Sequence, residues 1–316
     1  MSDTSLFDDI GRIEFSAYCI RYAGGKSRLK GSLAHAIHQF YDRHAGDFEY
    51  REPFLGSGSV AREVLENNHR HSSAHQIKRI WLNDKDPAMS CLWDCVINRP
   101  EALKQQAAKY KPTVEDFFKW KGELRDLDHL PGVNDRLDVA IKKMGLHQMS
   151  FSGLGTMGSV LGGHHQSGEM RVGSRWSVKK IHREIETYRR LFGNIEVTHG
   201  TCTALDFEPL IADPRPAFLL LDPPYYVQGP KLYQFAFTHE DHVRLARALK
   251  RTKHPWLMTY DICDEIVTLY EWADMEKILV PYSMGKKGVK EELLICPFKH
   301  SYLIDEYNAH QSSVRP

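Results

Sequence analysis

Residues 217–225 read Ala-Phe-Leu-Leu-Leu-Asp-Pro-Pro-Tyr, an apolar run that ends in a carboxylate, two prolines and an aromatic ring. A short apolar run bounded by turn residues predicts a fully buried strand. Ligands bind beyond the carboxyl ends of such strands in an open α/β sheet, so we expect Asp222 to lie where a reaction could take place. Pro223 and Pro224 lack an N–H group and fix φ at about −65°, so the backbone must leave the sheet in a stiff, extended turn.

This turn holds a carboxylate, a carbonyl and a ring side by side, which suits methylation of an exocyclic amine. The Asp222 carboxylate and the Pro223 carbonyl can each accept one N–H of an amino group and direct its lone pair toward an electrophile. Tyr225 can stack on the flat face of the base that carries the amine. The alternative is an ordinary turn whose aspartate caps a helix, because Asp and Pro are common turn residues. A cofactor site elsewhere in the chain would decide between the two.

The composition is that of a globular protein. The chain has 316 residues, a length that allows a sizeable core. Of these residues, 42% are hydrophobic and 26% are charged. Its formal net charge is +1, so binding to nucleic acid would require basic residues concentrated on one face. The six cysteines show no Cys-x-x-Cys spacing, and no metal site is predicted. Neither a signal peptide nor a membrane-spanning stretch is recognisable, so we expect a cytoplasmic protein without membrane contact.

Two glycine-containing segments are candidates for the cofactor site. The first, residues 21–27, reads Arg-Tyr-Ala-Gly-Gly-Lys-Ser and precedes an amphipathic helix predicted from about residue 28 to 43. It is not a Walker A loop, because Ile20 stands where that loop requires a glycine. The second, residues 52–60, reads Glu-Pro-Phe-Leu-Gly-Ser-Gly-Ser-Val and also precedes a helix. Its glycines allow a strand-to-helix turn to run close against a nucleotide-like group.

Asp84 strengthens this interpretation. It ends a strand predicted over residues 79–84, and an acid at the tip of the second strand commonly holds ribose hydroxyls. A nicotinamide enzyme could show the same pair of features, but nothing further along the chain supplies hydride chemistry. Asp206 and Phe207 follow a strand predicted at residues 195–198, and we expect them beside a cofactor ring.

A segment of different character separates these two parts of the chain. Residues 87–128 and about 135–144 have helical patterns, whereas residues 147–176 contain seven glycines and predict a hairpin or a loop. The most basic stretch follows, from Arg171 to Arg190. A basic helix is most often a solvated face, but beside a glycine-rich hairpin we interpret it as a surface for backbone phosphates, with the hairpin reaching base edges.

Four short motifs then occur in order: Tyr-Ala-Gly-Gly-Lys at 22–26, Glu-Pro-Phe-Leu-Gly-Ser-Gly-Ser at 52–59, Asn-Asp at 83–84 and Asp-Pro-Pro-Tyr at 222–225. With this order and spacing, the chain resembles the Dam-type (D12 class) DNA adenine-N6 methyltransferases over roughly residues 18 to 299. The resemblance implies an enzyme that transfers a methyl group from S-adenosylmethionine to a flipped adenine in a specific sequence of double-stranded DNA.

The resemblance also implies an architecture. It is a Rossmann-like α/β sheet with helices on both faces, interrupted by an inserted helical and β-hairpin target-recognition region. The boundaries predicted on this basis are a flexible N-terminal arm (1–17), a catalytic domain (18–110 and 192–299), a DNA-binding insertion (111–191) and a polar C-terminal tail (300–316).

Residue roles follow by position in the matching motifs. Tyr22 stands where a tryptophan is common in the family, which weakens stacking without removing it. Asp222 would touch the cofactor's amino group and accept from the target amine, and Tyr225 would stack on the extruded adenine. The catalytic motif comprises Asp222, Pro223, Pro224 and Tyr225. The cofactor-binding candidates are Tyr22, Lys26, Glu52, Phe54, Gly56, Gly58, Asp84, Asp206, Phe207 and Asp222. The DNA-binding candidates are Arg171, Arg175, Lys179, Lys180, Lys231 and Lys287.

Several alternatives stay open on the sequence alone. The target could be cytosine N4 or a base in RNA, although cytosine-N4 enzymes more often carry serine where Asp222 stands. The chain could instead be a DNA-binding or assembly subunit that kept the fold and lost catalysis. The region from 150 to 173 departs most from the family pattern, so the recognition sequence is not predicted. A monomer is favoured, and a restriction or defence-system partner is left undecided.

Overall fold

The computed structural model describes residues 22, 24–44, 46–70, 76–200, 203–282 and 288–314. The predicted N-terminal arm and Lys287 lie outside these residues. Within them, seven strands form one mixed sheet in the order β3-β2-β1-β4-β5-β7-β6. The strands are β1 (Glu49–Glu52), β2 (Arg79–Leu82), β3 (Glu196–Val197), β4 (Ala217–Leu221), β5 (Trp256–Asp261), β6 (Asp274–Tyr282) and β7 (Gly288–Cys296).

The direction of the strands creates a place for a ligand. Strands β1 to β5 pair in parallel, whereas β7 runs antiparallel to both of its neighbours, β5 and β6. The strand order reverses between β1 and β4, and an open sheet binds ligands beyond the carboxyl ends of its strands at such a switch point. The predicted buried strand and the predicted α/β sheet are both present.

Helices cover both faces of the sheet, and β4 shows why. Its side chains alternate, so Phe218 and Leu220 belong to one core and Ala217, Leu219 and Leu221 to the other. The first core includes side chains of α1 (Lys30–Arg43), α2 (Ser59–Arg70) and α12 (Tyr302–Val314). The second includes side chains of α8 (Glu208–Ala212), α10 (His239–Arg251) and α11 (Asp264–Leu269). Each leucine buried in this way contributes about 1.5–3 kcal/mol.

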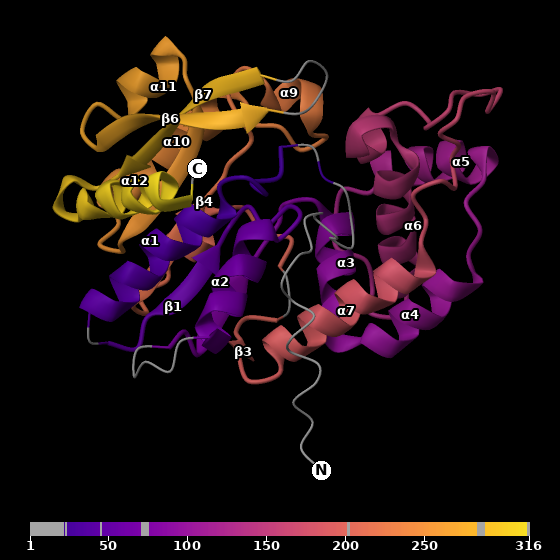
Figure 1. The fold of residues 1–316 in the computed structure, drawn as a ribbon, viewed down its shortest axis with the longest axis horizontal. Coiled ribbons are helices and arrows are strands. Elements are labelled where there is room, and N and C mark those ends of the chain that lie inside the picture. The colour runs from indigo at the N-terminus through magenta and orange to yellow at the C-terminus, as the bar shows by residue number, and fades with distance from the viewer. Residues whose placement is uncertain are drawn as a thin grey trace.

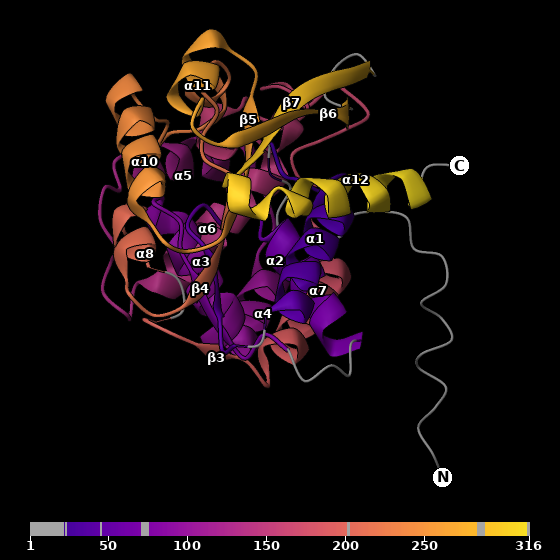
Figure 2. The ribbon, with the colours of Figure 1, turned by 90° about the vertical axis from the view of Figure 1, so that its left-hand side faces the viewer.

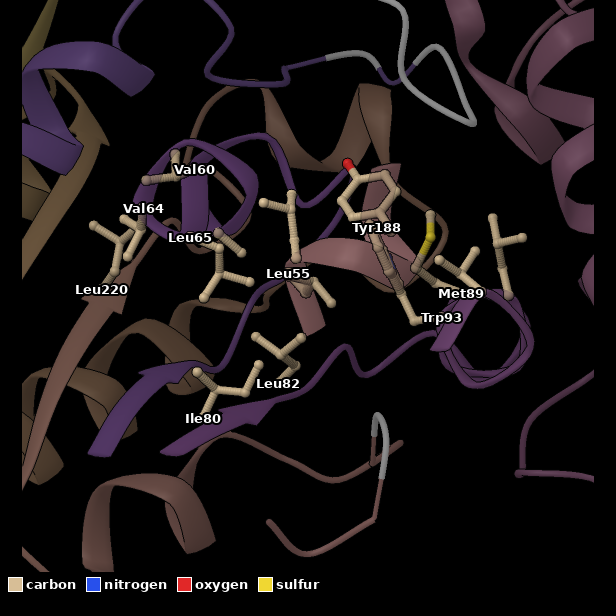
Figure 3. Close-up of a cluster of buried hydrophobic side chains, with 14 of the residues drawn as sticks. Leu55, Val60, Val64, Leu65, Ile80, Leu82, Met89, Trp93, Tyr188 and Leu220 are labelled. Atoms are coloured by element: carbon tan, nitrogen blue, oxygen red, sulfur yellow. The ribbon is translucent and has the colours of Figure 1, made fainter. Parts of the chain in front are cut away.

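Five helices between β2 and β3 form a group beside the sheet, on the right in Figure 1. They are α3 (Pro87–Asn98), α4 (Pro100–Lys109), α5 (Val114–Arg125), α6 (Arg136–Met149) and α7 (Val178–Phe192). α6 packs on α3, α4 and α5, and α7 packs on α3, α4 and α2. Figure 3 shows Trp93 of α3 and Tyr188 of α7 in one apolar cluster with Leu82 of β2. The helical group therefore shares a continuous core with the sheet.

Of the hairpin or loop expected in residues 147–176, all of which the structure describes, the structure shows a loop and no β-hairpin. They contain two short 3-10 helices, η2 (Phe151–Gly153) and η3 (Gly155–Met157), followed by turns. One isolated antiparallel bridge, between Ser150 and Val160, is the nearest feature to a hairpin in this segment. Positive φ angles at Gly153 and Gly155 turn the chain away from the extended conformation that a strand needs.

The predicted polar tail is a helix. α12 follows the short η4 (Phe298–His300) and lies across α1, as Figure 2 shows. Leu303, Ile304 and Tyr307 are buried and belong to the first core. Its apolar side chains recur at helical spacing in an otherwise polar sequence, and tertiary packing stabilises a helix of this kind. Across the described ranges, no helix combines the length and the apolar character that crossing a membrane requires.

Candidate active site

One cleft brings the motif residues together at the carboxyl ends of β1, β2 and β4. Its lining includes nine of the cofactor-binding candidates: Tyr22, Lys26, Glu52, Phe54, Gly56, Asp84, Asp206, Phe207 and Asp222. The tenth candidate, Gly58, lies in the glycine turn between the lining residues 57 and 59. Pro224 also lines the cleft, whereas Pro223 and Tyr225 adjoin it without belonging to its lining. Segments that are far apart in the chain thus meet on one surface.

The glycine turn after β1 cannot accept side chains. Gly56 has φ +48° and Gly58 has φ +64°, in the left-handed region that favours glycine. A Cβ on Gly58 would lie 2.5 Å from the indole ring of Trp93, and one on Gly56 would lie 3.0 Å from the ring of Tyr22. The Gly56 carbonyl accepts a hydrogen bond from Trp93 Nε1 at 2.9 Å. The two glycines therefore let the Trp93 and Tyr22 rings pack directly on the backbone of this turn.

Asp84 holds the same turn from the end of β2. Its Oδ2 accepts a hydrogen bond from the Gly56 N–H at 2.8 Å, and its Oδ1 accepts one from the Asp86 N–H at 3.0 Å. Burial, together with the nearby carboxylate of Asp86, raises the pKa of Asp84 to about 6, against the effect of these hydrogen bonds and of Lys143. Asp84 is therefore mainly ionised at neutral pH and becomes protonated in mild acid.

The neighbouring acid Glu52 differs in charge. It is buried, and its Oε2 accepts a hydrogen bond from the Tyr50 hydroxyl at 2.9 Å. Burial raises the pKa of Glu52 to about 8, so the side chain is mainly protonated at neutral pH. Two carboxyl groups at the ends of adjacent strands thus supply one hydrogen-bond donor and one acceptor that carries charge.

An aromatic group forms another part of the cleft. The rings of Phe54, Phe207 and Phe237 lie 5.5–6.0 Å apart, centre to centre, with tilted or edge-on geometry. Asp206, beside Phe207, is held by an ion pair with Arg244 at 2.8 Å. Flat apolar faces next to fixed carboxylates match a ligand with a heteroaromatic ring and a hydroxylated sugar, so these residues fit a nucleoside-containing cofactor.

The Asp-Pro-Pro-Tyr corner is held by cationic and neutral donors. Asp222 Oδ1 receives the Lys26 ammonium at 2.8 Å and the Thr259 hydroxyl at 2.9 Å. The same ammonium lies 4.6 Å from the centre of the Tyr225 ring. Burial by itself lowers the pKa of Lys26, but the carboxylates of Asp222 and Glu292 outweigh this effect and the pKa is raised. Lys26 is therefore a buried cation between the carboxylate and the ring.

The described DNA-binding candidates are spread over the glycine-rich segment, α7 and a short helix after β4. Arg171, Lys179, Lys180 and Lys231 are exposed. Arg175 is only partly exposed, and its Nη1 donates to the Ser150 carbonyl at 2.9 Å, so it supports the glycine-rich segment from within. Lys231 belongs to α9 (Gly229–Leu232), at the top of Figure 1, whereas α7 lies at the bottom beside α4.

The structure adds residues that the sequence did not single out. Lys143 and His147, one turn apart on α6, line the cleft, and Lys143 pairs with Asp86 at 2.5 Å. Thr259 and Asp261 lie at the end of β5 and Glu292 lies on β7, and all contact the Asp-Pro-Pro-Tyr corner or the residues after it. Asp261 carried a usable signal, since it ends a buried strand as Asp222 does. Lys143 and His147 carried no such signal, because they stand within an ordinary helical pattern.

Comparison with known proteins fits this geometry. A family model described as D12 class N6 adenine-specific DNA methyltransferase matches residues 22–284. That range contains the four motifs, the helical group and the sheet up to β6. A search of curated proteins gives no significant match.

The family match does not favour a target at cytosine N4 or in RNA, nor a subunit without catalysis. Methyltransferases of this family generally use S-adenosylmethionine. The cleft, the motif order and the family match together lead to one conclusion: the chain belongs to the D12 class of N6 adenine-specific DNA methyltransferases, enzymes that methylate adenine in DNA.

Proposed function

We propose that the cleft binds S-adenosylmethionine, and that an adenine extruded from a specific sequence of duplex DNA meets it at the Asp222 corner. The observation that carries this proposal is that Gly56, Asp84 and Asp222, from the segments that follow three different strands, line one cleft. When bound, the cofactor supplies an electrophilic methyl group on a sulfonium that is its own leaving group.

The sheet side of the cleft would hold the cofactor. The Asp84 carboxylate keeps acceptor capacity beyond its two backbone hydrogen bonds, which suits ribose hydroxyls. The glycine turn lets the cofactor's amino-acid part come close to the backbone at Gly56. Phe54 and Phe207 would flank the cofactor's ring, with Asp206 next to it. Tyr22 packs on this turn and stacks on Tyr233 at 5.7 Å between ring centres, and so would close the cleft over the cofactor.

The Asp222 corner would orient the target amine. Lys26 and Thr259 both engage Oδ1, so Oδ2 and the Pro223 carbonyl would accept the two N6 hydrogens. Accepting both hydrogens draws the N6 lone pair out of conjugation and points it at the methyl group. Tyr225 would face the extruded base, at an unstacking cost of a few kcal/mol. Positioning and hydrogen bonding would supply most of the rate acceleration.

The helical group would read the DNA. Residues 111–191 form the proposed target-recognition region, and 154, 156 and 157 from its glycine-rich segment reach the cleft. Lys231 stands beside Leu232 and Tyr233, which line the cleft from the sheet side, so it would meet a backbone phosphate near the extruded base. Arg171, Lys179 and Lys180 would contact phosphates further along the duplex. A monomer has every motif in its own cleft and would suffice for the reaction.

Product analysis tests this function directly. Purified protein is incubated with labelled S-adenosylmethionine and unmethylated duplex DNA, and the nucleosides are separated by chromatography. We expect N6-methyladenine from the wild type and from Asp264→Asn, an exposed acid at the start of α11, and none from Asp222→Asn. N4-methylcytosine, or product in RNA alone, would contradict the proposed substrate. Failure to bind S-adenosylmethionine in calorimetry would contradict the proposed cofactor.

A further inference from the structure

The two prolines of the Asp-Pro-Pro-Tyr corner create a structural problem. Pro223 and Pro224 have no N–H group, so the sheet cannot anchor the corner through the backbone donors that normally follow a strand. Tyr225, Tyr226 and Val227 provide the first N–H groups after Asp222. A catalytic carboxylate and an aromatic ring must nevertheless be held to within a fraction of an ångström. The anchors must therefore come from side chains on neighbouring strands.

β5 brings two such side chains to the corner. Leu221 of β4 pairs with Met258 of β5, so the next residues along, Asp222 and Thr259, lie side by side. Thr259 is fully buried, and its hydroxyl donates to Asp222 Oδ1 at 2.9 Å. Asp261 lies two residues further and thus on the same face of the strand.

Asp261 supplies the missing backbone anchor. Its Oδ1 accepts a hydrogen bond from the Tyr226 N–H at 2.9 Å, and its Oδ2 accepts one from the Val227 N–H at 2.8 Å. Hydrogen bonds to an ionised carboxylate are roughly twice as strong as those between neutral groups. One side chain thus fixes two consecutive peptide units just after the proline turn.

Glu292, on the next strand β7, holds the Tyr225 ring. Glu292 of β7 pairs with Asp261 in the antiparallel register, and its Oε2 accepts a hydrogen bond from the Tyr225 hydroxyl at 2.6 Å. The Tyr225 ring also stacks on Tyr260, with 5.9 Å between ring centres. The ring is therefore held at its hydroxyl end and on one face before any base arrives.

We propose that Thr259, Asp261 and Glu292 are positioning residues for methyl transfer: they hold the carboxylate and the ring of the Asp-Pro-Pro-Tyr corner from β5, which adjoins β4, and from β7, which adjoins β5. This inference rests on the proposed role of Asp222. Thr259 selects which carboxylate oxygen faces the amine, Asp261 fixes the backbone after the prolines, and Glu292 sets the tilt of the Tyr225 ring. None of the three touches the methyl group or needs to exchange a proton.

Two variants of Thr259 separate the role of its hydroxyl from that of its shape. Thr259→Val keeps the shape and removes the hydroxyl, whereas Thr259→Ser keeps the hydroxyl. We expect the valine variant to lose at least about tenfold in kcat, with KM for DNA and the calorimetric Kd for S-adenosylmethionine within about twofold of wild type. The serine variant should recover kcat to within about threefold. Equal kcat in the valine variant and the wild type would overturn the proposal, as would equal losses in both variants.

A second pair covers the case in which Thr259→Val does not fold. Asp261→Asn replaces one of two acceptors with a donor that faces a backbone N–H, and Asp264→Asn is the exposed control three residues away. For Asp261→Asn we expect a lower kcat, with cofactor affinity unchanged and a melting temperature within a few degrees of wild type. Asp264→Asn should keep the wild-type kcat. Loss of cofactor binding, or kcat equal to the control, would contradict the positioning role.

Different results would contradict the proposed function and the positioning role of Thr259 and Asp261. If wild-type protein forms no N6-methyladenine, or if Asp222→Asn remains active, the proposed function fails and the variants on β5 have no bearing. If the wild type is active, Asp222→Asn is inactive and both Thr259→Val and Asp261→Asn match the wild type, only the positioning role fails.

Discussion

The cleft has two walls of different origin. The sheet wall comes from short motifs at strand ends, and Gly56, Asp84 and Asp222 lie on it. The helical wall comes from α6 and the glycine-rich segment after it, which contribute Lys143 and His147. Strand ends in a parallel sheet must meet at one edge, so short motifs suffice to place the first wall. The second wall depends on how a long helical group docks, and no local pattern specifies that.

The largest effect is expected at the sheet wall. Asp222→Ala removes the acceptor for the target amine, and we expect kcat to fall by at least on the order of 10²- to 10³-fold, as for loss of one preorganised group in other active sites. DNA affinity, measured by fluorescence anisotropy, should change less than about twofold. A variant that loses DNA binding and turnover together would show that the two walls are not separable in function.

The junction of the two walls should be the next most sensitive point. Gly58→Ala forces a side chain into a left-handed conformation and against Trp93 of α3, so we expect a loss of about 2–4 kcal/mol in the free energy of unfolding. Gly163→Ala is a matched control, because Gly163 has φ +69° and open space around its Cβ position. It should cost only about 1–2 kcal/mol. Denaturant titration measures both, and equal losses would show that the contact with Trp93 is unimportant.

Lys143→Met addresses the helical wall. It removes the cation that pairs with Asp86, and we expect about 2 kcal/mol lower stability, less than for a fully buried pair because the Asp86 side chain is 16% exposed. The unpaired Asp86 also makes Asp84 harder to ionise, so the Kd for S-adenosylmethionine should rise several-fold in calorimetry. Lys142→Met, on the adjacent residue that pairs with Glu123 and Asp138, should leave that Kd unchanged. An unchanged Kd in both variants would confine cofactor binding to the sheet wall.

A pH titration tests whether ionised Asp84 contributes to cofactor binding. Burial raises the pKa of Asp84 to about 6, so acidification through pH 6 protonates it and removes an acceptor from the proposed ribose site. The affinity for S-adenosylmethionine should therefore fall as pH decreases, by about tenfold, or about 1.4 kcal/mol, between pH 7 and pH 5. Calorimetry across this range should show a flat profile for Asp84→Asn. A wild-type profile equally flat would remove Asp84 from the cofactor site.

Single surface lysines should give the smallest effects. DNA affinity falls with salt concentration, and each lost phosphate contact makes the slope of log affinity against log salt shallower by about 0.9. We expect Lys231→Ala, beside the sheet wall, to show this change, with a loss of up to about 1 kcal/mol in DNA affinity at moderate salt. Lys180→Ala, on α7, should show a smaller change, because α7 lies at the other end of the molecule from α9 (Figure 1). The reverse ranking would place the duplex along α7.

The amino-acid sequence alone determined the elements whose signals are local. The apolar run of β4 predicted a buried strand, and the glycines at 56 and 58 predicted a tight turn. Parallel strand ends share an edge, so these local signals also predicted that Asp84 and Asp222 lie close to one cleft.

Tertiary structure alone decided the rest. Thr259 meets Asp222 only through strand register, Lys143 reaches the cleft only through the docking of α6, and the polar residues 302–314 form a helix because α1 and the sheet bury its apolar side chains. The glycine-rich segment turns away from a hairpin through backbone angles that neighbouring contacts select. Each of these outcomes depends on the free energy of contacts between residues distant in the chain, and no local sequence pattern specifies which distant residues come into contact.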